Sequence, residues 1–395
     1  MPVAISKSPK TPDRKKPAEM MSLFIGLMSG TSLDGVDGVL ARFPDSGKTG
    51  KPGIVASAHV PFDLVMRQQL MALQSAGHDE IEREALAANR LARLYAECVD
   101  VLLKKSALPS DRITAIGVHG QTIRHRPDLG FTRQTNNPAL LAELSHIDVI
   151  ADFRSRDIAS GGQGAPLVPA FHNAVFGSNT VSRAVVNIGG IANISILPPD
   201  GLVSGFDTGP GNMLLDAWVQ AHRNQPYDMD GQWAQEGHFS DELLKVFLDE
   251  PFFDQPPPKS TGRDLFHLDW LRAKLFASPR FASLEPVDVQ ATLTQLTAVT
   301  IAKAVAKYAP NCREVYLCGG GARNGYLVEL LGKTLRRYTV PAVLTTSDAL
   351  GIDPMQVESL AFAWLAYRFV NRKPGNLPAV TGAAGFRPLG ALYPA

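Results

Sequence analysis

The chain has 395 residues, of which 45% are apolar, and it carries 39 Lys or Arg against 38 Asp or Glu. This length suggests two domains, or one large split domain, with a sizeable packed core. The balanced charge gives no overall field for nucleic acid or for an anionic membrane surface, so neither partner is expected and any phosphate binding must be local.

The start of the chain and its cysteines predict a cytoplasmic protein. Residues 1–21 are rich in Lys, Arg and Pro and lack the apolar run of a signal peptide, so we expect a disordered basic tail. No apolar run reaches the roughly 18 residues that span a bilayer. The three cysteines, Cys98, Cys312 and Cys318, form no CxxC pair. Buried thiols in a reducing compartment are therefore expected rather than disulfides or a zinc site.

The first half of the chain is predicted to form a hairpin followed by alternating helices and strands. Residues 22–43 place two apolar, strand-like runs around a centre rich in Gly, Ser and Thr, which predicts a β-hairpin with a wide turn. Apolar residues at steps of three and four over 79–105 predict a long amphipathic helix. A short strand that ends at Gly120, a helix over 139–146 and a buried strand over 148–153 are expected to follow.

The second half repeats this pattern approximately. A second hairpin is predicted from Ser182, around a turn that contains Gly and Asn, and a strand then leads into a helix over 213–223. Residues 226–264 are expected to be irregular. Helices are predicted over 288–308 and 354–370, with a strand, a glycine turn and another helix between them. The two halves predict a mixed α/β fold with two similar lobes facing a cleft, where loops from both would meet a ligand.

Three glycine-rich turns are candidates for nucleotide binding. The first lies in the hairpin over 22–43, the second spans 187–193 and the third spans 319–324. Glycines allow the backbone to approach a phosphate, and two opposed turns could hold a triphosphate from both sides. The first turn is not a Walker A loop, because no Gly-Lys-Ser/Thr follows it. The third, between a strand and a helix, could support a nucleoside. Ordinary hairpin turns, and tight packing in the third case, are the alternatives.

Two acidic residues are candidates for acid–base chemistry. Asp207 follows a predicted strand and precedes glycines in GFDTGPGN, which suits a general base; a turn-forming Asp that bonds its own backbone is the alternative. Glu358 lies in an otherwise apolar helix and would add a second acidic group if that helix lines the cleft. Compensation of the helix dipole at the surface is the alternative for Glu358.

Polar residues after the predicted strands could bind a polar, acidic sugar. An arginine can match a carboxylate in two-point fashion, although solvated loop charge would produce the same composition. The candidates in these segments are His119, Gln121, Thr122, Arg124, Asp152, Arg154 and Arg156.

Seven motifs, taken together and in this order, resemble those of the anhydro-N-acetylmuramic acid kinase family over roughly residues 22–390. The motifs are GLMSGTSLDGVD, VHGQT, GGQGAPLVP, NIGGIAN, GFDTGPGN, GGGARN and ESLAFAWLA. The resemblance implies the two-lobed α/β fold of actin-like ATPases and sugar kinases, with mixed sheets flanked by helices and a cleft between the lobes. It also implies a homodimer.

The resemblance further implies an ATP-dependent reaction. The family phosphorylates 1,6-anhydro-N-acetylmuramic acid with hydrolytic opening of the anhydro ring, giving N-acetylmuramic acid 6-phosphate and ADP, in peptidoglycan recycling and amino-sugar catabolism. An ordinary hexose or polyol kinase without ring opening remains an alternative, as does a nucleotide-binding regulatory ATPase. Mg²⁺ is expected to travel with ATP. Many members of the wider superfamily have an Asp where this chain has Met28, so no protein ligand is assigned to the metal.

The same resemblance assigns roles to individual residues. Asp207 takes the position of the catalytic base, and Glu358 that of a second acidic residue. His119, Gln121, Thr122, Asp152 and Arg156 are the residues that we expect to bind the sugar. The residues expected to bind ATP are Gly30, Thr31, Ser32, Leu33, Asp34, Gly35, Val36, Asp37, Asn187, Gly189, Gly190, Gly319, Gly320 and Gly321.

The expected division of the chain follows from these assignments. Residues 22–150 and 371–395 should form the first lobe, which carries the phosphate hairpin. Residues 151–370 should form the second lobe, which carries the catalytic Asp and the nucleoside turn.

Overall fold

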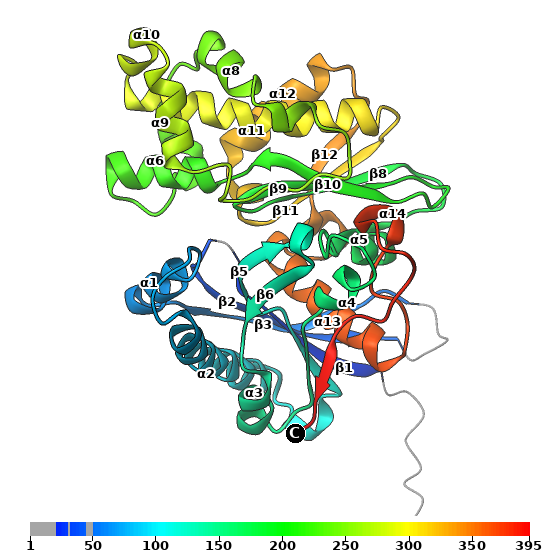
Figure 1. Cartoon of the computed structure of the whole chain (residues 1–395). Helices are drawn as coiled ribbons and strands as arrows, with labels where there is room; N and C mark the ends of the chain where they lie inside the picture. Colours follow the sequence, from blue (N-terminus) through cyan, green and yellow to red (C-terminus); the bar gives the residue numbers. More distant parts are fainter. Residues whose placement is uncertain (1–20, 31, 45–49) are drawn as a thin grey trace, which may run out of the picture.

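The computed structural model describes residues 21–30, 32–44 and 50–395, which form two lobes built on separate sheets (Figure 1). The six-stranded sheet has the order β13-β7-β4-β1-β2-β3, and the five-stranded sheet the order β10-β9-β8-β11-β12. The predicted α/β architecture of mixed sheets flanked by helices is therefore confirmed. The predicted basic tail lies outside the described residues except for Met21. Among the described helices, none is long and apolar enough to cross a membrane.

The first lobe consists of the six-stranded sheet and helices on both of its faces. Its strands are β1 (Ser22–Met28), β2 (Gly35–Phe43), β3 (Gly53–Pro61), β4 (Ala115–Val118), β7 (Val149–Ala151) and β13 (Ala391–Tyr393). The helices that accompany it are α1 (Leu64–Ala72), α2 (Glu80–Ser106), α3 (Pro138–Ser145), α4 (Ser155–Ile158) and α13 (Val357–Val370). Two further helices lie where the lobes meet: α5 (Val168–Phe176) contacts α13 and two strands of the second sheet, and α14 (Pro378–Thr381) contacts the edge of that sheet.

The predicted first hairpin is confirmed, and its strands are apolar on both faces for a reason visible in the packing. β1 pairs antiparallel with β2 and parallel with β4. Alternate residues of a strand point to opposite faces. Ile25 and Leu27 pack in the core beneath α2, whereas Phe24 packs in the core beneath α13. Because helices cover both faces, the strand shows a continuous apolar run instead of alternation.

Helix α13 lies directly on the sheet because two glycines leave room for it. A Cβ atom on Gly26 would lie 1.9 Å from the carbonyl oxygen of Ser359, and one on Gly117 would lie 2.1 Å from that of Phe362. Ser359 also donates a hydrogen bond from its hydroxyl to the carbonyl of Asp37, at 3.1 Å. The lobe boundaries drawn from the sequence stay a prediction, but α13, assigned there to the second lobe, packs against β1, β2 and β4.

The second lobe is built on the other predicted hairpin. Its strands are β8 (Arg183–Ile188), β9 (Ile191–Leu197), β10 (Ser204–Pro210), β11 (Glu314–Cys318) and β12 (Val343–Thr346). Its helices are α6 (Met213–Arg223), α7 (Gln232–Glu236), α8 (Asp241–Leu248), α9 (Leu268–Phe276), α10 (Pro279–Ala282), α11 (Pro286–Tyr308) and α12 (Gly325–Arg337). Helix α11 is buried around nearly its whole circumference from Val289 to Ala302, because it lies between the sheet and α6, α7, α8 and α12.

Two segments differ from the sequence prediction. Residues 226–264, expected to be irregular, include α7 and α8; α8 begins at a Ser240 cap that accepts the Leu243 N–H and buries Leu243, Leu244 and Phe247. The polar segment after Gly120 is a two-stranded hairpin, β5 (Gln121–Arg126) and β6 (Phe131–Thr135). This hairpin stands on the side of the first lobe that faces the second (Figure 1).

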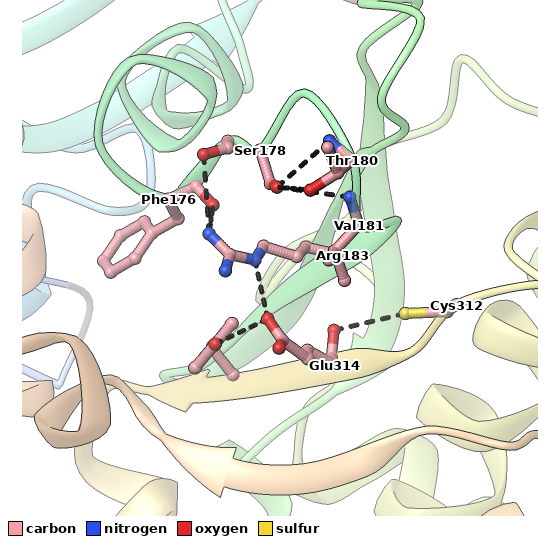
Figure 2. A network of polar contacts seen from close by, with 9 residues as sticks. Phe176, Ser178, Thr180, Val181, Arg183, Cys312 and Glu314 are labelled. Atoms are coloured by element: carbon pink, nitrogen blue, oxygen red, sulfur yellow. Dashed lines mark hydrogen bonds and ion pairs between the residues drawn. The ribbon is translucent and has the colours of Figure 1, made fainter.

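A polar network fixes the end of α5 to the second sheet. Figure 2 shows Arg183 between Phe176, at the end of α5, and Glu314 on the neighbouring strand. The guanidinium donates to Glu314 Oε2 at 2.7 Å and to the Phe176 carbonyl at 2.8 Å, and the Tyr316 hydroxyl donates to the same carboxylate oxygen. Since these groups satisfy one another, the network has a structural role.

We predict that Gly26→Ala destabilises the protein, because the added methyl group must displace the backbone of α13. Overpacking of this kind costs about 1–3 kcal/mol. Urea unfolding measures the loss, with Gly53→Ala as the matched control, since a Cβ there meets no atom within 4 Å. Equal unfolding midpoints for the two variants would contradict the proposed close contact.

Candidate active site

The first glycine turn joins β1 to β2 and is anchored at its base. The Ser29 hydroxyl is hydrogen bonded to the Tyr95 hydroxyl of α2 at 2.8 Å, and the Leu33 N–H donates to the Gly30 carbonyl. Leu33 has a φ of 56°, a left-handed conformation that closes the turn. A Cβ on Gly30 would meet no heavy atom closer than 3.7 Å, so its backbone is open to a ligand. Thr31 lies outside the described residues.

In the rest of this turn, two residues are acidic and two others pack against neighbouring parts of the structure. Asp34 accepts a hydrogen bond from Ser32 at 2.8 Å, and Asp37 is paired with His59 at 2.8 Å. Burial raises the pKa of Asp37, and His59 opposes that shift. Gly35 is packed, because a Cβ there would lie 2.4 Å from a backbone oxygen of β3, and Val36 is fully buried. The two carboxylates are therefore the groups of this turn that carry charge.

The second turn, between β8 and β9, is tied to the start of α6. The Gly190 carbonyl accepts N–H groups from Gly211 and Met213, and the Gly189 carbonyl accepts that of Asn212, at 2.8–3.1 Å. A Cβ on Gly189 would have no heavy atom within 3.5 Å, which leaves one side of the turn open. The turn therefore holds a fixed position with an accessible backbone.

The third turn packs on the second. A Cβ on Gly319 would lie 2.3 Å from the Asn187 amide oxygen, and one on Gly321 would lie 2.3 Å from the Ile188 side chain. Gly319 also has a φ of 79°, which favours glycine. Gly320 is open, with 3.7 Å to the nearest atom. Close packing thus explains Gly319 and Gly321, whereas Gly320 leaves its backbone accessible.

Glu358 connects the first and second turns. The Asn187 side chain donates a hydrogen bond to its carboxylate, which lowers the pKa, whereas the charges of Asp37 and Asp34 raise it. Burial is the largest influence, and the net effect raises the pKa of Glu358 to about 7. Its neighbour Ser359 is bonded to β2. The structure therefore brings groups of both predicted phosphate turns together around this carboxylate.

Asp207 lies on β10, at the edge of the second sheet, beside a register shift between Asp207 and Gly209. The Thr261 N–H donates to its carboxylate at 3.0 Å, and its own N–H donates to the Lys259 carbonyl. Burial raises the pKa of Asp207 to about 7, against the opposing effects of the Thr261 hydrogen bond, Arg154 and Lys259. A carboxyl group of this pKa is poised for proton transfer near neutral pH.

Arg154 links the two carboxylates electrostatically. Its positive charge lowers the pKa of both Asp207 and Glu358. Its guanidinium donates to the Gly164 carbonyl at 2.8 Å and to His119 Nε2 at 3.0 and 3.1 Å. Burial, together with the charge of Arg154, holds the pKa of His119 well below its usual range, so this ring stays neutral and accepts. Carboxylates with raised pKa values around one cation form a functional-site pattern.

The residues expected to bind the sugar divide into two groups. His119 and Gln121 are buried, and the Gln121 amide oxygen has no hydrogen-bond partner among the described residues. Thr122 accepts from Gln134. Asp152 and Arg156 are exposed. The sugar-binding role of all five stays a prediction.

Sequence reasoning missed several groups of this site. Arg154 was a candidate but did not belong to the five residues expected to bind the sugar. Arg124, another candidate, pairs with Glu80. Lys259 and Thr261 come from the segment expected to be irregular, where the polar run KSTGRD after three prolines was the available signal. A further group lies on α6: burial raises the pKa of Asp216 to about 7, Arg263 opposes this, and the charge of Asp34 adds to it.

Two α/β lobes, with open glycine turns and two carboxylates of raised pKa set among them, are the arrangement of a two-lobed kinase. The model of the anhydro-N-acetylmuramic acid kinase family matches residues 22–395. The chain belongs to this family.

Curated relatives extend this match. An anhydro-N-acetylmuramic acid kinase of Paraburkholderia xenovorans (strain LB400) is 59% identical over 374 residues, covering 94% of this chain and 98% of its own. One of Burkholderia orbicola (strain MC0-3) is 57% identical over 386 residues, covering 98% and 99%. Among solved structures, the activator of the 2-hydroxyisocaproyl-CoA dehydratase from Clostridium difficile aligns with 88% of this chain and 96% of its own, at TM-score 0.47 and 13% identity. That last likeness is distant.

We predict that Asp207→Asn stabilises the fold at alkaline pH. An unfolded Asp ionises near 3.9, whereas Asp207 has a pKa of about 7 when folded. The folded state therefore binds the Asp207 proton more tightly than the unfolded state does. The protonated carboxyl group contributes fully to the stability of the fold below about pH 4, and this contribution is lost as the pH rises through about 7. The amide lacks this penalty, and the variant should gain about 1–3 kcal/mol at pH 8.

Urea unfolding at pH 5 and pH 8 tests this pH dependence, with the exposed Asp100→Asn of α2 as control. The gain should shrink towards pH 5 for Asp207→Asn and be absent from the control. A variant that is no more stable than the wild type at pH 8 would show that Asp207 carries no burial penalty.

Proposed function

We propose that the protein transfers the γ-phosphate of ATP to 1,6-anhydro-N-acetylmuramic acid while opening the anhydro ring. The products are N-acetylmuramic acid 6-phosphate and ADP. The observation that carries the proposal is Asp207, a carboxyl group of pKa about 7 that is held by Thr261 and balanced by Arg154. The names of the relatives, at 57–59% identity over nearly the whole chain, supply the substrate.

In this proposal the glycine turns place the nucleotide. The open backbones at Gly30 and Gly189 face the triphosphate from the two lobes, and Gly320 lies beneath the nucleoside. The charge on Asp34 and Asp37, which already raises the pKa of Glu358, suits a cation that enters with the phosphates. No group of three or more His, Cys, Asp or Glu among the described residues could hold a metal by itself. Mg²⁺ is usually bound through nucleotide phosphates and one or two carboxylates, and in this proposal it enters with ATP. When bound, it neutralises phosphate charge.

Asp207 acts as the general base in this mechanism. It takes a proton from a water molecule, whose oxygen attacks the anomeric carbon. The bond between C1 and the bridging oxygen breaks, and that oxygen, which stays bonded to C6, attacks the γ-phosphate and releases ADP. Arg154 limits the negative charge around Asp207 and Glu358, which keeps Asp207 ionisable near neutral pH. Placement and charge neutralisation are the protein's main contributions to phosphoryl transfer.

The sugar is bound by the first lobe in this proposal. His119 and Gln121 come from the segment that leads into the β5–β6 hairpin, and the hydrogen bonds between Arg154 and His119 fix their neighbourhood. Thr122, Asp152 and Arg156 complete the proposed set. The cellular setting that we propose is the cytoplasm, with the protein acting in peptidoglycan recycling as a homodimer.

A coupled ADP-release assay tests the substrate. We expect turnover with 1,6-anhydro-N-acetylmuramic acid and at most slight turnover with N-acetylglucosamine or glucose. Preference for glucose would indicate an ordinary hexose kinase. ADP release that does not depend on any sugar would indicate a regulatory ATPase, and either result would overturn the proposal.

We predict that Asp207→Asn lowers kcat by at least about 10²-fold, the usual worth of a general base. Circular dichroism and the unfolding midpoint should show an intact fold. Asp100→Asn, which changes an exposed carboxylate of α2 in the same way, should keep wild-type kcat. Turnover of Asp207→Asn close to that of the wild type would remove the residue from the base role.

We also predict that Arg154→Met moves the acidic limb of the pH profile. Activity should rise with pH through about 7 in the wild type, because Asp207 must lose its proton to act. Loss of the neighbouring positive charge should raise that apparent pKa by about one unit. The measurement is kcat/KM against pH, with the exposed Arg112→Met as control. An unshifted limb would contradict the electrostatic link.

A further inference from the structure

A cavity lies in the second lobe, on the face of its sheet that is turned away from the first lobe. It has a volume of about 370 Å³ and lies between β10 and the C-terminal half of α11. Figure 1 places α11 on the far side of that sheet. Phe206 and Thr208 line the cavity from β10, and these residues flank Asp207 in the sequence. The cavity is therefore separate from the proposed active site, and its size is that of small-molecule sites.

The walls of this cavity are aromatic and its charges are mostly positive. Aromatic rings come from separate elements, with Phe253 after α8, Tyr308 at the end of α11 and Tyr338 after α12. Lys259, Lys303 and Lys307 also line it. Against these three lysines stands one acidic residue in the lining, Asp254.

Lys259 is held in place before any ligand arrives. Its amino group donates to the carbonyls of Phe252 and Phe253 at 3.0 and 3.1 Å, and it lies 4.5 Å from the centre of the Phe252 ring. Burial and the positive charge of Lys307 lower its pKa. A fixed ammonium group beside a second one favours the arrival of an anion.

Lys303 and Lys307 form a like-charge pair one turn apart on α11. Such pairs at i and i+4 destabilise a helix by about 0.2–0.5 kcal/mol. The ion pairs of the described residues include neither lysine, and Lys307 is placed over the Tyr308 ring at 5.2 Å. Both residues are exposed and line the cavity. An anion bound there would relieve the repulsion and bury its apolar part between the rings.

We propose that this cavity binds a small organic anion, in which one phosphate or carboxylate group is attached to an apolar body. The charged group lies at the three lysines, and the apolar body lies against the aromatic walls. The site is linked to the catalytic strand through Lys259, whose carbonyl accepts the Asp207 N–H. Binding here does not depend on the proposed sugar kinase activity.

Isothermal titration of phenyl phosphate into the full chain tests this proposal without any turnover. We expect binding by the wild type and at least about tenfold weaker binding by the Lys303→Ala, Lys307→Ala double variant, a change of about 1.4 kcal/mol. The matched control removes two helix lysines elsewhere, Lys104 and Lys333, and should bind as the wild type does. Benzyl alcohol, a neutral probe of similar shape, should bind weakly and equally to all three proteins.

Two results would overturn the proposal. One is the absence of detectable heat when phenyl phosphate is titrated into the wild type up to about 10 mM, because a site with a millimolar Kd would be occupied at that concentration. The other is equal binding by the wild type and the double variant, which would show that Lys303 and Lys307 do not hold the anion. Alanine is a strong helix former at these exposed positions, so an unchanged unfolding midpoint should accompany the expected loss.

Discussion

The close contact between α13 and the first sheet is the constraint on which the site depends. Gly26 and Gly117 allow the helix backbone to approach the strands, to where a Cβ would lie 1.9 and 2.1 Å from its carbonyl oxygens. Packed interiors do not absorb displacements of that size, so the helix has one position on the sheet. Glu358, in its first turn, is thereby held between the charges of Asp34 and Asp37 and the amide of Asn187. A helix from the end of the chain thus joins the turns of both lobes.

A second constraint sets the chemistry around this junction. Burial raises the pKa values of Asp207 and Glu358 to about 7, and Arg154 opposes both shifts. Buried carboxylates of this kind reduce stability when ionised, and carboxyl groups with such raised pKa values are typical of sites where a proton moves near neutral pH. Arg154 is fixed in turn by His119 and the Gly164 carbonyl. Burial of the two carboxylates is therefore the origin both of the lower stability and of the proposed catalytic role.

The hairpins, the long helices and both candidate carboxylates could be predicted from the sequence, because each is encoded locally. Glycine between two apolar runs predicts a turn, and apolar residues at helical spacing predict α2 and α11. The partners of those elements could not be predicted in this way. Arg154 rather than Arg156 faces the carboxylates, and Lys259 and Thr261 reach Asp207 from an irregular segment. These contacts join residues that are distant in the sequence, so the local sequence pattern does not predict them. The placement of α13 on the first sheet is hidden for the same reason.

In the proposed mechanism, Asp207 directs water to the sugar while the bridging oxygen takes the phosphate. The most direct measurement is the position of the isotope after turnover in H₂¹⁸O, read by mass spectrometry of the fragmented product. We expect one ¹⁸O atom at C1 and none between C6 and phosphorus. Product with ¹⁸O in the phosphate ester would contradict this mechanism. So would phosphorylated sugar that lacks ¹⁸O at C1 when it is analysed before the C1 oxygen exchanges with water.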